Sequence, residues 1–144
     1  MAGYRLESAQ HAEHCGEPDE ERVVKAIEGI DPARPDPFVV LDHEDGHYIQ
    51  TLGSSSGLVL ECRIMNDADP RGFRHWRAWA PGDGEDPGKA DPRSGEWGPW
   101  IHERDHLEEA QVVFAFLRFG EDAKSLPDVR GVAWRDVTEE FPEA

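Results

Sequence analysis

The chain has 144 residues and carries 31 Asp and Glu against 15 Lys and Arg, which gives a formal net charge of −16. This length fits one folded domain, and five Trp and six Phe argue against a disordered chain. The negative charge repels phosphate backbones and anionic membrane surfaces, so we expect neither direct nucleic-acid binding nor membrane binding. The beginning of the chain contains no apolar leader and the two cysteines are isolated, which predicts a cytoplasmic protein.

The N-terminal segments predict one strand and one short helix. Residues 3–10 alternate weakly between apolar and polar side chains, as in a strand. Residues 17–21 place a proline and several acids where a helix begins, and apolar residues follow at helical spacing up to Ile30. We therefore predict a helix over about residues 18–28 that ends at Gly29.

Four β-favouring segments follow, at residues 38–41, 48–52, 58–64 and 72–80. Asp45-Gly46 separates the first two segments and predicts a hairpin with a two-residue type I′ turn. In this register Glu44 faces His47 and His43 faces Tyr48, which sends the two histidines to opposite faces of the sheet.

The C-terminal segments predict a loop, a long helix and a last strand. Residues 81–99 are rich in Gly, Pro and Asp and predict a flexible loop. A helical stripe of apolar residues runs from Leu107 to Leu117 and includes Phe114, with a second apolar face at Val112, Phe116 and Phe119 and a stop at Gly120. Residues 131–134 predict a strand before a frayed C-terminus. Residues 1–144 therefore predict a single α+β domain with a flexible N-terminus, in which an antiparallel meander of about four to six strands packs against one long and one short helix.

Two segments match the HExxH pattern of zinc hydrolases, at residues 43–47 and 102–106. The pattern works on a helix, because residues four apart then share a face and both imidazoles reach one metal while the Glu activates the bound water. The predicted hairpin separates His43 from His47, and only a three-residue loop would bring His43 opposite His47. We therefore expect no metal at the first match.

For the second match, two helix starts remain open. A helix that begins before His102 stacks His102 and His106 beside Glu103, whereas an N-cap at Asp105 leaves His102 outside the helix. The apolar run from Leu107 favours the later start, and no third ligand follows at the usual spacing. We therefore predict no cofactor and no catalysis. A zinc hydrolase with His102 and His106 as ligands and Glu103 as base is the alternative.

Candidate partner-binding residues come from the predicted hairpin, the central strands and the tryptophans. Glu61, two residues before Arg63, is either a buried functional acid or half of an ion pair on the solvent side of the sheet. Tryptophan is enriched in binding hot spots, although core filling is its other use. The candidates are Asp42, Glu44, Asp45, Glu61, Trp76, Trp97 and Trp100.

Five segments occur in a characteristic order: GHYIQTLG, LVLECR, FRHW, VVFAFLRFGED and GVAWRDVT. Over residues 38–137 this series resembles a family of small actinobacterial proteins, the immunity proteins of polymorphic toxin systems, in the first-numbered of the Imm families. The resemblance implies an intracellular antidote without catalysis that binds one cognate secreted toxin domain, often a nuclease or deaminase. The acidity of the chain is similar to what blocks a basic, nucleic-acid-processing cleft. A small-ligand-binding domain is a further alternative.

Overall fold

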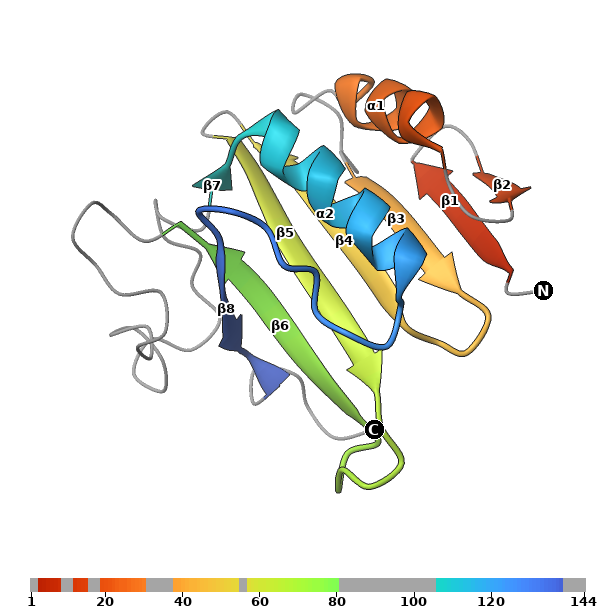
Figure 1. Cartoon of the computed structure of the whole chain (residues 1–144), viewed down its shortest axis with the longest axis vertical. Helices are drawn as coiled ribbons and strands as arrows, with labels where there is room; N and C mark the ends of the chain where they lie inside the picture. Colours follow the sequence, from red (N-terminus) through yellow and green to blue (C-terminus); the bar gives the residue numbers. More distant parts are fainter. Residues whose placement is uncertain are drawn as a thin grey trace.

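A computed structural model describes residues 3–8, 12–15, 19–30, 38–54, 57–80 and 106–138. In chain order the elements are β1 (Tyr4–Ser8), β2 (Ala12–Cys15), α1 (Glu20–Glu28), β3 (Phe38–His43), β4 (Tyr48–Ser54), β5 (Gly57–Met65), β6 (Phe73–Trp79), β7 (His106–Leu107), α2 (Glu109–Glu121) and β8 (Ala133–Asp136). The strands form one antiparallel sheet in the order β2-β1-β3-β4-β5-β6-β8, with β7 paired to β5. Both helices lie on the same face of this sheet (Figure 1).

The structure confirms the predicted α+β class and the antiparallel meander, which runs from β3 to β6. Within the described residues the sheet has eight strands, more than the four to six predicted. The additional ones are mainly the short strands β2 and β7, which lie in segments without a clear alternation. No helix in this part of the chain is long and apolar enough to cross a membrane.

Helix α1 begins and ends close to the predicted residues. The Asp19 side chain caps it by accepting a hydrogen bond from the Arg22 N–H at 2.8 Å, and Gly29 is the C-cap. Val23 and Ile27, four residues apart, are buried in the core. The sequence therefore specified this helix through its cap and its apolar spacing.

The β3–β4 turn has one more residue than predicted. Asp42 pairs with Tyr48, and the His43 N–H donates to the His47 carbonyl oxygen at 2.8 Å, so His43 lies opposite His47 across a three-residue loop. The prediction that the two histidines point to opposite faces is therefore wrong. The loop has positive φ at Gly46 alone, at 97°, whereas a type I′ turn needs it at two central residues.

Helix α2 is specified by a capping box, in which the Glu108 side chain accepts from the backbone at Gln111 and the Gln111 side chain accepts from the Glu108 N–H. Phe116 and Phe119 are fully buried against the sheet, whereas Phe114 is 47% exposed. The face predicted as second is therefore the core face. Gly120 does not stop the helix but lies buried inside it.

The core lies between the helices and the covered face of the sheet. Leu41, Ile49 and Leu60 come from neighbouring strands and are fully buried there with the α2 phenylalanines. The Tyr4 hydroxyl of β1 donates to the Gly120 carbonyl oxygen of α2 at 2.9 Å, which joins β1 to the helix layer. Burial of this many large apolar side chains is the main source of stability in a domain of this size.

Several predicted features lie outside the described residues. They are the predicted loop at residues 81–99, the candidate residues Trp97, Trp100, His102 and Glu103, and most of the C-terminus that was predicted to fray. The structure does not test these predictions.

Candidate functional site

A polar cluster occupies the sheet face that points away from the helices. Cross-strand partners project from the same face, and the registers pair Glu61 with both Gln50 and Arg77. The next pair on this face of β5 and β6 is Arg63 and His75. We call these five side chains the Glu61 cluster.

The Glu61 carboxylate is the centre of the cluster, and its side chain is only 7% exposed. Oε1 accepts a hydrogen bond from His75 Nε2 at 2.8 Å and another from Gln50 Nε2 at 3.2 Å. Oε2 accepts from Arg77 Nε at 2.8 Å. Both oxygens of the buried carboxylate are therefore bonded, as a charge at this depth requires.

The tautomer of His75 follows from its second partner. Arg63 Nε lies 3.0 Å from His75 Nδ1, and an arginine nitrogen can only donate. Nδ1 must then accept, so the ring carries its proton on Nε2 and donates it to Glu61. His75 is fully buried, and its backbone is also fixed, because its N–H donates to the Thr138 hydroxyl at 2.9 Å.

The cluster keeps Glu61 ionised far into the acid range. Burial acts to raise the pKa of Glu61, but the hydrogen bond from His75 and the charge of Arg77 outweigh it and lower the pKa from 4.5 to about 2. A general base works best with a pKa near the operating pH. Glu61 is therefore suited to orienting His75 and Arg77 rather than to accepting protons from a substrate.

Aromatic rings line one side of the cluster. The Arg63 guanidinium lies 3.8 Å from the centre of the Phe73 ring and 5.5 Å from that of Tyr48. Burial raises the pKa of the Tyr48 hydroxyl, and the charge of Arg63 opposes this rise. The Arg63 guanidinium thus contacts two aromatic rings while its Nε donates to His75.

Glu61 does not pair with Arg63 on the solvent side, which corrects one of the two interpretations of this strand. Glu61 bonds across the strands to Arg77 and His75, and Arg63 bonds to His75 instead. The alternation of β6 did place His75 and Arg77 on one face, but their contact with Glu61 depends on the β5–β6 register. That register is set by the turn between the strands, which the sequence pattern does not specify.

The other candidate partner residues do not converge on Glu61. Asp42 shares the open face, where burial and then Glu7 raise its pKa against the effect of Arg5. Glu44 and Asp45 are exposed at the β3–β4 turn, and Trp76 lies half-buried on the helix side of β6. Among the candidates that the structure describes, it thus brings together only Glu44 and Asp45, the two acids of the turn.

The first HExxH segment does not form the helical site that the pattern requires, and of the second segment only His106 lies within the described residues. His43 and His47 flank a β-turn, and each Nδ1 accepts a backbone N–H, from Asp45 at 3.1 Å and from Met65 at 2.9 Å. His106 belongs to strand β7, three residues before α2 begins, so it does not start that helix. Within the described residues, no group of three or more His, Cys, Asp or Glu could hold a metal ion.

Comparisons of this chain with protein-family models, with curated proteins and with solved structures find no match. Its function must therefore be argued from the chemistry of its own residues.

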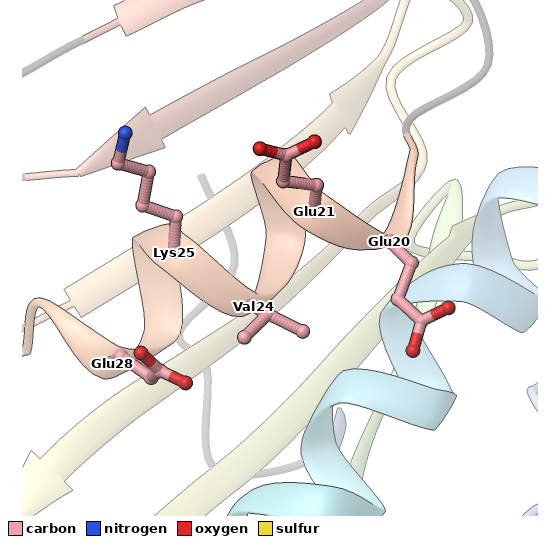
Figure 2. A pocket seen from close by; sticks show the side chains of 5 residues that line it. All are labelled: Glu20, Glu21, Val24, Lys25 and Glu28. Atoms are coloured by element: carbon pink, nitrogen blue, oxygen red, sulfur yellow. The ribbon is translucent and has the colours of Figure 1, made fainter.

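A shallow hollow on the outer surface of α1 is lined by three carboxylates and one ammonium group. Glu20, Val24 and Glu28 project to one side of the helix axis, and Glu21 and Lys25 project to the other (Figure 2). The hollow adds negative charge to the helix layer, on the side of the molecule opposite the Glu61 cluster.

Proposed function

We propose that this chain is a non-catalytic immunity protein of the cytoplasm, which binds a cognate basic toxin domain and thereby blocks it. The observation that supports this most is the separation of charge in the described residues. Arg77 and Arg135 are each 5% exposed, whereas exposed Asp and Glu outnumber exposed Lys and Arg. Such a surface attracts a cationic protein and repels phosphate.

The exposed carboxylates lie on several elements that a partner can reach together. They include Glu20, Glu21 and Glu28 of α1, Glu44 and Asp45 of the β3–β4 turn, and Glu108, Glu109, Glu121 and Asp122 around α2. A toxin that acts on nucleic acid needs a basic cleft to hold the phosphate backbone. An acidic protein that covers such a cleft competes directly with its substrate.

The Glu61 cluster supports the non-catalytic part of the proposal. Its central carboxylate has both oxygens bonded and a pKa of about 2, so it behaves as a fixed anion that joins three strands. The order of the five sequence segments that resemble the immunity family supports the choice of a toxin as the partner.

The test begins with the gene immediately upstream: the proposal expects it to encode a secreted protein with a toxin-like C-terminal domain, and that domain is co-expressed with this chain. We expect the chain to restore growth and to form a complex that survives size-exclusion chromatography at low salt but weakens as salt rises. Failure to protect, together with no detectable binding, would contradict the proposal. About one zinc per untagged chain, lost on His102→Ala, would favour the zinc-hydrolase alternative instead.

A further inference from the structure

The β3–β4 turn is held to its surroundings by two neighbouring imidazoles. The rings of His43 and His47 lie with their centres 5.9 Å apart, and His47 is 5% exposed. The ring of Tyr4, from β1, packs edge-on against His43 at 5.0 Å. The turn therefore rests on a buried pair of titratable groups.

Both rings use Nδ1 as a hydrogen-bond acceptor. His43 Nδ1 accepts the Asp45 N–H at 3.1 Å, inside the turn, and His47 Nδ1 accepts the Met65 N–H at 2.9 Å, at the end of β5. A backbone N–H can only donate, so each Nδ1 is unprotonated and each ring is neutral with its proton on Nε2. Neither imidazole can take a second proton in this arrangement without losing its backbone hydrogen bond.

The bond from Met65 to His47 joins two elements that also pack against each other. A side chain at Gly46 would meet Met65 Cγ at 3.1 Å, so the turn lies directly on the last residue of β5. The turn is tied to β1 as well, because the Glu44 N–H donates to the Gly3 carbonyl oxygen at 3.0 Å. Loss of the His47 bond would therefore loosen the contact between the turn and β5 before it affects the core.

The charged groups around the pair come from the turn and from the segment after α2. Asp45 Oδ2 lies 3.6 Å from His43 Nδ1. Burial lowers the pKa of His47, and the neighbouring His43 and then Lys124 lower it further, against the opposing effects of Asp45 and Asp122. Asp122 and Lys124 directly follow α2, and the C-terminal end of this helix lies near the β3–β4 turn (Figure 1).

We propose that His47, packed beside His43, forms a proton-sensitive latch, in which protonation of His47 Nδ1 breaks its hydrogen bond with the Met65 N–H and releases the β3–β4 turn from the end of β5. The latch is closed at neutral pH and opens in mild acid. Opening displaces the exposed carboxylates of Glu44 and Asp45, so under the proposed function it also changes the surface offered to a basic partner. The latch itself does not depend on that function.

The test is NMR spectroscopy of the whole chain at pH 7.5 and pH 5.5. Ring ¹⁵N shifts at pH 7.5 should show that both histidines are protonated on Nε2 alone. The hydrogen-exchange protection factor of the Met65 amide should fall by up to about tenfold at pH 5.5, because His47 in the opened turn has its ordinary pKa of 6.5 and is then mostly protonated, whereas the closed turn disfavours the proton. The amides of Ile49 and Leu60 in the core should keep their protection.

The matched control is the double variant His43→Asn and His47→Asn, because the Asn side-chain oxygen replaces the Nδ1 acceptor but does not titrate. Its Met65 protection factor should be the same at both pH values. Protonation on Nδ1 at pH 7.5, or an unchanged Met65 protection factor in the natural chain, would overturn the proposal. So would an equal loss at Leu60, which indicates global unfolding, or a pH response that persists in the double variant.

Discussion

The Glu61 cluster and the β3–β4 turn use the same residue types to different ends. In both, a histidine accepts an N–H donor at Nδ1 and an acid lies nearby. In the cluster, the acid is buried and accepts the Nε2 proton of His75 directly. At the turn, the Asp45 side chain is 56% exposed, and it lies near His43 rather than against the buried His47.

This difference separates a permanent charge from a titratable one. The cluster supplies a donor for each oxygen of Glu61, so its charge is compensated and its pKa falls to about 2. The turn buries an imidazole that has no direct carboxylate partner among the described residues, and burial favours the neutral form of His47. Burial alone does not determine the pKa of a group. The hydrogen bonds and charges that its ionised form meets determine it as well.

Removal of the buried carboxylate should have the largest effect. Glu61→Ala leaves the guanidinium of Arg77 buried without its carboxylate, and loss of one partner from a buried ion pair costs about 3–5 kcal/mol. Urea unfolding at pH 7 measures the loss. Asp128→Ala, at an exposed site, should stay within about 0.5 kcal/mol. A loss below about 1 kcal/mol in Glu61→Ala would show that the cluster is not what joins these strands.

Acidification should reduce the free energy of unfolding through the same carboxylate, by a smaller amount than its removal. The folded chain holds Glu61 deprotonated down to about pH 2, whereas the unfolded chain takes up the proton near the ordinary pKa of 4.5. The contribution is therefore fully present above about pH 4.5 and is lost as the pH falls towards 2. Between pH 6 and pH 3 the loss should be about 2 kcal/mol.

Glu61→Gln is the control for this pH dependence, because it keeps the shape of the side chain and removes its titration. Urea unfolding of both proteins at pH 6 and pH 3 should give a shallower acid slope for the variant. Equal slopes would mean that Glu61 titrates at its ordinary pKa in the folded chain. A carboxyl ¹³C titration of the natural chain reads the same pKa directly.

Most of the secondary structure could be predicted from the sequence, but fewer of the side-chain contacts could. The cap at Asp19, the spacing of Val23 and Ile27 and the alternation of β5 and β6 are local signals, and each gave the right element. The register at Asp45-Gly46 was wrong by one residue, because the chain gives positive φ to Gly46 alone and so lengthens the loop. A slip of one residue moves every side chain to the other face, which is how His43 and His47 came together.

The Glu61 cluster was only half predictable for the same reason. Alternation placed His75 and Arg77 on one face of β6, but which of them meets Glu61 depends on the non-local pairing of β5 with β6. The neighbouring Arg63 was the obvious partner by sequence distance. In the structure Arg63 bonds to its cross-strand partner His75 instead, because residues two apart on a strand are farther from each other than direct cross-strand neighbours.

The exposed acids of the turn should give the smallest change in stability and a clear change in binding. Glu44→Gln with Asp45→Asn removes two exposed charges, so unfolding should change by no more than about 0.5 kcal/mol. The association rate with the cognate toxin domain of the proposed function should fall several-fold at low salt and little at high salt, because exposed charges act mainly through long-range steering. Asp128→Asn, one exposed charge elsewhere, is the control. Stopped-flow rates that change equally in both variants would show that net charge matters and the turn does not. A selective loss in the turn variant would mean that the acids left outside the sheet guide the partner, while the one acid held inside it maintains the fold.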